Sequence, residues 1–236
     1  MIVPPQPDFA TLPRARLERM HAAGIEVREC HRVLGKGGLN IVGEVLKGQG
    51  TFYQLDHYPK GDVFDRDTHS QYYYHAHRDG EHGHFHTFLR APGMPAGLRP
   101  VPDAKGRDWP KGDQALAHIV AVSMDKIGFP LRLFTTNRWV TGETWHDATA
   151  MIAMLDRFEI DHAYPSWPTN RWITAMLRLF HPQIVALLEA RDAGLAAHRA
   201  AHPGVDVYED KALEVISEVA IDVEAQISAI EAQLDP

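Results

Sequence analysis

The sequence predicts an α+β fold: a mostly antiparallel sheet carries a histidine-rich hairpin, and an α-helical C-terminal half ends in a long helical hairpin. Two alternating, aromatic-rich segments flank Asp79-Gly80, a dipeptide typical of tight hairpin turns. Short connections join the β-prone segments, and such connections favour antiparallel pairing. From Glu143 onward the apolar residues recur every three or four positions, which is the period of a helix.

The first region, residues 1–38, is expected to be helical after a proline-rich start. Apolar residues recur at helical spacing from Leu12 to Leu34, and the glycines at 35, 37 and 38 are typical of a helix end. Gly24 lies inside this helix and is expected to kink or split it, because glycine is a poor helix former.

The second region, residues 39–142, is expected to hold the sheet and the hairpin. Segments 39–47 and 51–58 are β-prone, and Pro59 is expected to end the second of them. Segments 116–124 and 131–136 are predicted as further strands, which gives a sheet of five or six strands. Residues 91–113 contain five prolines and form a long connection without structure of its own. This connection is either a lid over the site or a surface excursion.

The third region, residues 143–236, is expected to be helical, and all three regions are expected to form one unit. Thr144 and Asp147 resemble a capping box, Thr169 is predicted to cap a second helix, and Pro182 to open a third that runs to Ala201. From Asp210 the apolar residues alternate steps of three and four, as in a coiled-coil seam. An antiparallel helical hairpin explains this pattern, and a homodimer built on the last helix is the alternative.

The hairpin predicts a cluster of imidazoles on one face of the sheet. If Asp79 and Gly80 are the two-residue loop, residues pair outward from Arg78 and Glu81, and side chains alternate between the faces. The pairs that then share a face are His77 with His82, His75 with His84, and Tyr73 with His86. Histidines that were merely enriched on the protein surface would not be expected to occupy alternate positions along both strands. Because neutral imidazoles bind divalent metals, we interpret this face as a metal site.

The spacing also ranks the ligands. His75 and His77 can lean toward each other across the gap between alternate strand residues, and His84 lies opposite His75, so these three are expected to coordinate the ion. His82 lies beside the turn and is the most replaceable ligand. Tyr73 and His86 are expected to act as acid/base partners toward the substrate. A β-bulge would change the faces, and the sequence leaves open whether His57, His118 or His146 joins the site.

A second interpretation of the motif uses a carboxylate. His77-Arg78-Asp79 has the H-x-D spacing of an iron site with two histidines and one carboxylate. It would place Asp79 on the metal and remove it from the turn, so the turn chemistry of Asp-Gly disfavours it.

Composition restricts the class of protein. A net charge of −7 and the absence of a basic run argue against nucleic-acid binding. The single cysteine, Cys30, excludes an internal disulfide and a thiolate-rich metal site. The N-terminal residues lack the pattern of a secretory signal, and no apolar run reaches the roughly 20 residues needed to span a bilayer. We therefore expect a soluble, cytoplasmic protein that binds neither membranes nor nucleic acid.

The motifs DHYPKGD and QYYYHAH…EHGHFHTF resemble an uncharacterised family of bacterial proteins. The resemblance covers residues 12 to 160, and the histidine block is its specific part. It implies a bacterial, cytoplasmic protein and carries no established activity and no catalytic residues.

Three classes of function follow from these features. The first is a mononuclear metal-dependent enzyme that acts on a small molecule; three-histidine sites leave a position open, and imidazoles suit Zn, Fe, Cu or Ni. Hydrolase or lyase and oxygenase chemistry both remain open. The second class is a metal- or haem-binding protein without turnover, with haem the less favoured group. The third is an interaction protein that uses the C-terminal helical hairpin.

Overall fold

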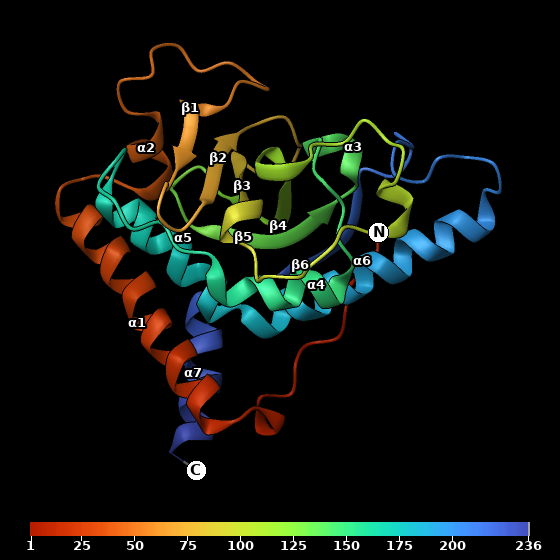
Figure 1. Cartoon of the computed structure of the whole chain (residues 1–236). Helices are drawn as coiled ribbons and strands as arrows, with labels where there is room; N and C mark the ends of the chain where they lie inside the picture. The colour runs from red at the N-terminus through yellow and green to blue at the C-terminus, as the bar shows by residue number, and fades with distance from the viewer. Residues whose placement is uncertain (236) are drawn as a thin grey trace.

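A six-stranded antiparallel sheet forms the centre of the molecule, and its strand order follows the chain (Figure 1). The computed structural model describes residues 1–235; Pro236, the last residue of the third expected region, lies outside them. The strands are β1 (Tyr58–Phe64), β2 (Ser70–His75), β3 (Gly83–Arg90), β4 (Leu116–Met124), β5 (Pro130–Thr136) and β6 (Val215–Ala220). The predicted α+β class with an antiparallel sheet is confirmed.

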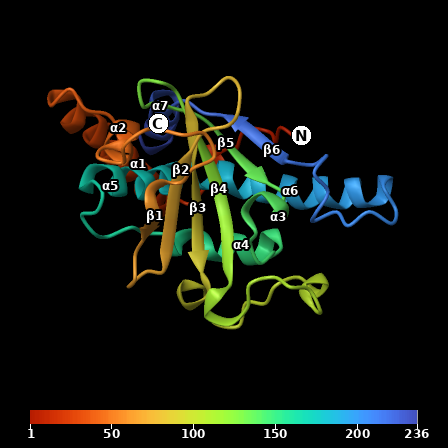
Figure 2. The ribbon, with the colours of Figure 1, turned by 90° about the horizontal axis from the view of Figure 1, so that it is seen from above.

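The main helices cover one face of this sheet (Figures 1 and 2). Phe85 on β3 packs against Trp172 with 5.6 Å between ring centres, and the Ser217 hydroxyl on β6 donates to the carbonyl of Leu187 at 2.8 Å. The helices are α1 (Arg14–Lys36), α2 (Ile41–Leu46), α3 (Arg138–Thr141), α4 (Ala148–Met154), α5 (Trp167–Leu179), α6 (His181–Ala201) and α7 (Val223–Leu234). Short 3-10 turns occupy Phe9–Thr11, Ala91–Gly93, Pro102–Ala104, Gly112–Gln114 and Leu155–Arg157.

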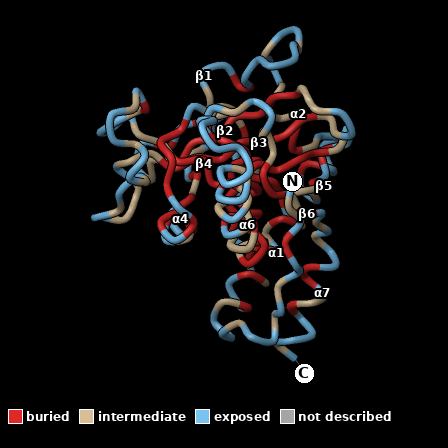
Figure 3. The backbone as a smooth tube through the Cα atoms, turned by 90° about the vertical axis from the view of Figure 1, so that its right-hand side faces the viewer, coloured by how far each residue is buried: buried red, intermediate tan, exposed pale blue. Residues whose placement is uncertain are grey.

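One main hydrophobic core joins the helices at both ends of the chain to the covered face of the sheet. It extends from Leu17 on α1 to Ile230 on α7, and a smaller core surrounds Trp109, Trp145 and Tyr208. Buried residues are concentrated in the sheet, whereas α1 and α7 extend from this body as a pair (Figure 3). Within residues 1–235, no helix combines the length and apolar character required to cross a bilayer.

The predicted first helix is confirmed as α1, which runs without a break through Gly24. Gly24 instead allows α7 to approach: a Cβ at this position would lie 2.5 Å from Cγ1 of Ile227 and 3.3 Å from Cδ1 of Leu179. Ile227 is fully buried there. The glycine therefore allows α1 and α7 to cross closely. The packing at this crossing offsets the destabilising effect of a glycine inside a helix.

The two strands predicted at 39–47 and 51–58 are wrong. The first segment forms α2, because the Asn40 side chain accepts a hydrogen bond from the amide of Gly43 at 2.8 Å and so caps a helix. Ile41, Val42 and Val45 then share one buried helical face. Strand β1 begins where the second predicted strand should have ended, and Pro59 lies inside it. An edge strand tolerates proline because one row of its amides needs no partner.

The long helical hairpin predicted at the C-terminus is also incorrect. Residues 215–220 form β6, which pairs with β5, and Asp222 then caps the shorter helix α7 by accepting from the amide of Ala225 at 2.9 Å. The β-branched Val215, Ile216 and Val219 suit a strand, although Ile216 also falls on the predicted coiled-coil seam. Helix α7 packs mainly on α1, and α6 packs mainly on β5, β6 and α4; α6 meets α7 at one point, where Gln183 donates to the side-chain oxygen of Gln226 at 2.7 Å.

Other predicted boundaries shift by a few residues. The second helix of the C-terminal half begins at Trp167, ahead of the predicted cap Thr169, and Asp147, not Thr144, caps α4. Strand β4 coincides with the prediction, and β5 begins one residue early.

The close crossing predicts opposite effects of the same substitution at two glycines of α1. Gly24→Ala should lower the free energy of unfolding by about 1–3 kcal/mol relative to Gly35→Ala, because overpacking against Ile227 opposes the gain in helix propensity that both variants share. A Cβ at Gly35 has no atom within 4 Å, so Gly35→Ala should be neutral or stabilising. Urea denaturation measures both. Equal stability of the two variants would show that α7 does not pack on Gly24.

Candidate metal centre

The register of β2 and β3 is the one predicted from the sequence. Tyr73 pairs with His86, Tyr74 with Phe85, and His75 with His84. Because Phe85 faces the helices through Trp172, alternation places His84 and His86 on the opposite face, together with His75 and Tyr73. The histidine block therefore occupies the side of the sheet that the main helices leave uncovered.

The predicted two-residue turn does not form. The ladder ends at the pair His75–His84, and residues 76–82 make a loop in which Gly80 has a φ of +81° and Asp79 does not adopt the left-handed conformation. A type I′ turn needs positive φ at both central residues. As a result, His77 and His82 do not oppose each other across the ladder.

The loop separates the two histidines it carries. Nδ1 of His82 lies 2.7 Å from the Tyr74 hydroxyl, on the side of the sheet that faces the helices, and its ring lies near Phe52. His77 instead joins His75, with ring centres 4.8 Å apart. Of the four histidines predicted as ligands, the structure therefore gathers three and places His82 elsewhere.

His75, His77 and His84 form a group that could hold a metal ion. Each offers one nitrogen, and these nitrogens all lie within 4.8 Å of one another. Nε2 of His75 is 2.7 Å from Nε2 of His84, and the rings of His77 and His84 are 5.1 Å apart between centres. His75 and His84 are buried, while His77 is partly exposed. The sequence pattern thus predicted a real convergence of imidazoles.

A carboxylate that the sequence analysis missed fixes the orientation of His84. Nδ1 of His84 donates to Oε1 of Glu81 at 2.5 Å, which leaves Nε2 of the neutral ring free to coordinate. Metal-binding histidines commonly donate their other nitrogen in this way. The only signal in the sequence was the spacing of three residues between Glu81 and His84.

Two arginines and His84 keep Glu81 charged inside the protein. Burial by itself raises the pKa of this carboxyl, but the hydrogen bond from His84 and the charge of Arg78 outweigh burial, so the pKa lies below its ordinary value. Arg78 and Arg132 lie 3.9 Å and 3.8 Å from Oε2 of Glu81. A charged Glu81 remains available as an acceptor for His84.

Burial keeps His75 and His84 neutral. Loss of water lowers the pKa of His75 to about 2, with further lowering from His84, His77 and His57. Burial also lowers the pKa of His84, against the opposing influence of Glu81. A neutral imidazole keeps the lone pair that a metal needs.

His86 lies beside the three-histidine group and is held by a further histidine. Its Nδ1 is 2.9 Å from Nε2 of His118 on β4, and its ring centre is 4.8 Å from that of His84 and 5.0 Å from that of His75. Nε2 of His86 is buried and has no hydrogen-bond partner within residues 1–235. Burial lowers the pKa of His86 well below its usual range and that of His118 to about 3.

His57 and Tyr73 lie on the more open side of the group. Their rings stack with 3.6 Å between centres, and the ring of His57 approaches that of His75 edge-on at 5.7 Å. Nδ1 of His57 is 3.2 Å from Oδ1 of Asp62. Burial raises the pKa of Tyr73, so this side chain stays a phenol. Of the three histidines left open by the sequence, His57 and His118 border the group, while His146 lines a separate cavity.

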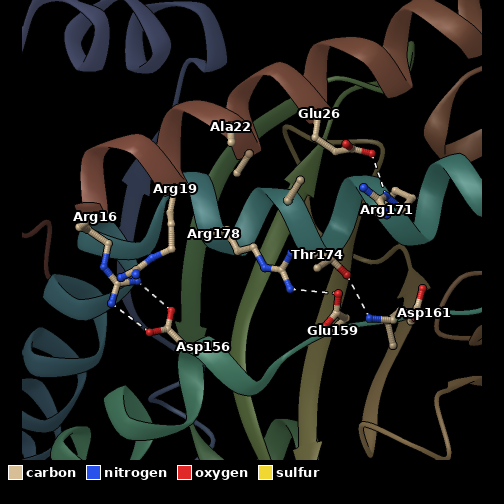
Figure 4. Close-up of a pocket in the computed structure, with 13 residues that line it drawn as sticks. Arg16, Arg19, Ala22, Glu26, Asp156, Glu159, Asp161, Arg171, Thr174 and Arg178 are labelled. Atoms are coloured by element: carbon tan, nitrogen blue, oxygen red, sulfur yellow. Dashed lines mark hydrogen bonds and ion pairs between the residues drawn. The ribbon is translucent and has the colours of Figure 1, made fainter. Parts of the chain in front are cut away.

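Away from the histidine group, a hollow of about 540 Å³ lies between α1 and α5 and is lined by charged side chains (Figure 4). Arg16 pairs with Asp156, Arg171 with Glu26, and Arg178 with Glu159. These ion pairs neutralise one another across the hollow, so it has no excess charge to select a ligand. The histidine group is the stronger candidate site.

The model of a protein family described as a domain of unknown function, DUF6969, matches residues 21–221. The match covers the whole sheet and the histidine group. No curated protein and no solved structure matches the chain significantly.

The buried imidazoles predict that the metal-free protein loses stability as the pH falls below about 6.5. In this range the unfolded chain binds protons that folded His75, His84, His86 and His118 do not bind. Each such group lowers the free energy of unfolding by about 1.4 kcal/mol per pH unit. Glu143 acts in the opposite sense, because burial raises its pKa to about 7 and the folded protein holds the extra proton.

Urea denaturation in the presence of a chelator, between about pH 7 and 5, measures this slope. His118→Gln should reduce the slope of the free energy of unfolding against pH by the contribution of about one proton, about 1.4 kcal/mol per pH unit. His202→Gln, at an exposed position after α6, serves as the control and should leave it unchanged. A stability that is flat over this range, or the same slope in His118→Gln and the parent protein, would contradict the burial of neutral imidazoles.

Proposed function

This chain belongs to the DUF6969 family, and we propose that it is a mononuclear metal-dependent enzyme that acts on a small molecule. The observation that carries the proposal is the convergence of His75, His77 and His84 within 4.8 Å of one another. Burial keeps His75 and His84 neutral, and Glu81 orients His84. These are the features of a prepared ligand set, in which His84 already directs the unprotonated Nε2 into the group.

The number of donors favours a catalytic role over a structural one. Structural zinc sites usually have four protein ligands and often use cysteine, whereas sites with three histidines leave a position for water or substrate. The single cysteine, Cys30, is buried on α1 among the helices and is not part of this group. Imidazole donors suit Zn, Fe, Cu and Ni, so the proposal is for a divalent transition metal.

The packing of the rings supports an ion over haem. The Nε2 atoms of His75 and His84 are 2.7 Å apart, and the His77 ring closes on both. A porphyrin would need a flat slot between or beside its axial ligands. The three imidazoles occupy that space themselves.

The neighbouring side chains supply positions for acid/base chemistry. A bound divalent ion with an open position would lower the pKa of a water molecule toward 7 and so supply a nucleophile at neutral pH. Tyr73, held as a phenol, can donate a hydrogen bond to a substrate, and the unpartnered Nε2 of His86 can accept one. His57, exposed and paired with Asp62, lies beside His75 and is within reach of a molecule bound at the ion.

The two histidines of the hairpin loop provide the sharpest test of the ligand set. We expect His77→Ala to lose most bound metal, because it removes one of three donors, and His82→Ala to retain it. His82 is the matched control, since it lies in the same loop but bonds to Tyr74 on the other side of the sheet. Elemental analysis after loading with zinc and removal of free ion measures the ratio of metal to protein.

Circular dichroism should show both variants folded. If the two variants hold the same amount of metal, whether all of it or none, the three-histidine group is not the ligand set and the proposed enzyme loses its basis.

A further inference from the structure

The segment between β3 and β4 lies at the end of the sheet away from the hairpin loop (Figure 2). Its residues, with Thr144 and His146, line an open cavity of about 690 Å³. Four prolines contribute to its wall, together with Met94 and Leu98. Trp109, only 5% exposed, also lines it. This volume and this apolar lining are typical of sites for small molecules.

Hydrogen bonds hold the cavity open without a ligand. The amide of Val101 donates to the carbonyl of Trp145 at 3.1 Å, the Thr144 hydroxyl donates to the carbonyl of Pro110 at 2.7 Å, and the amide of Ala91 donates to the carbonyl of Ala115 at 2.8 Å. The prolines restrict the backbone between these ties. A ligand would therefore enter a formed site and would not have to order the segment.

The charges at this cavity are all positive. Arg99, Lys105 and Lys111 are the charged side chains among the described lining residues, and all three are exposed, which places them at the rim. None of them forms an ion pair within residues 1–235. The acidic residues of the same segment do not line the cavity, and one of them, Asp103, pairs with Arg199. In a chain of net charge −7, this rim is a local exception.

The one imidazole in the wall does not add to this positive charge. Nδ1 of His146 is 2.9 Å from the carbonyl of Thr144, which can only accept, so Nδ1 carries the proton and Nε2 is an acceptor. Burial lowers the pKa of His146 and keeps it neutral. An anionic group therefore belongs at the rim, and the interior suits an apolar body.

We propose that this cavity binds an amphipathic carboxylate, with its hydrocarbon body inside and its carboxylate near Arg99, Lys105 and Lys111. The site is separate from the metal centre. His84 and Arg90 are six residues apart on β3, a separation of roughly 20 Å, and the cavity begins beyond Arg90. If an experiment shows that one of the two sites does not bind its ligand, the proposal for the other site is unaffected.

Titration with decanoate, followed by tryptophan fluorescence, tests the proposal. Decanoate should bind saturably at one site, and decyltrimethylammonium, which has the same chain length and a positive head group, should bind at least tenfold more weakly. Because Trp109 lines the cavity, the fluorescence change should disappear in Trp109→Phe.

Charge variants at the rim test the placement of the carboxylate. Replacing Arg99, Lys105 and Lys111 together by Gln should weaken decanoate binding about tenfold or more, since one exposed charge contributes roughly two- to fivefold. The control replaces Lys36, Lys126 and Lys211, which are exposed elsewhere, and changes the net charge by the same amount. Three results would overturn the proposal: no saturable binding of decanoate, equal binding of the cationic analogue, or equal weakening in the two triple variants.

Discussion

The alternation of side chains along β2 and β3 is the constraint on which the rest of the site depends. The Tyr72 hydroxyl lies 2.6 Å from the side-chain oxygen of Asn170 on α5, and Phe85 packs on Trp172 of the same helix. A slip of one residue would turn both aromatic side chains away from the core and expose them to water. The helices therefore fix the register, and the register places His75 directly opposite His84 on the other face. Packing on one side of the sheet thus determines chemistry on the other.

The site concentrates polar groups that a stable core would avoid. Nε2 of His86 and Oε2 of Glu81 are buried without hydrogen-bond partners within the described part of the chain, and such atoms cost stability. Burial also lowers the pKa of His75 and His86, so these rings do not bind the protons that exposed imidazoles would bind. Arg78 and Arg132 offset part of this cost by keeping Glu81 charged beside His84. These costs are understandable if the group exists to bind an ion, because the neutral donors and their fixed orientation then favour binding.

Sequence reasoning succeeded where local chemistry and tertiary packing agree. The parity of the hairpin gave the register and the face, and the long amphipathic pattern gave α1. It failed where short polar residues outweighed the apolar period: Asn40 converted a β-prone segment into α2, and Asp222 divided an apparent heptad into β6 and α7. In the site, the end of the ladder at His75 could not be foreseen, so His82 was grouped with His77. The sequence pattern did not indicate Glu81, because its role depends on the folded loop that brings it to His84.

The central claim, that three imidazoles on the free face of the sheet hold one ion, is tested most directly by a crystal structure of the zinc-loaded protein with anomalous diffraction data. The account predicts a single strong peak with one nitrogen each of His75, His77 and His84 at about 2.0–2.1 Å. A peak coordinated by His82, or by the stacked pair His198 and His202 at the end of α6, would contradict it. So would zinc-loaded crystals that show no peak at the histidine group.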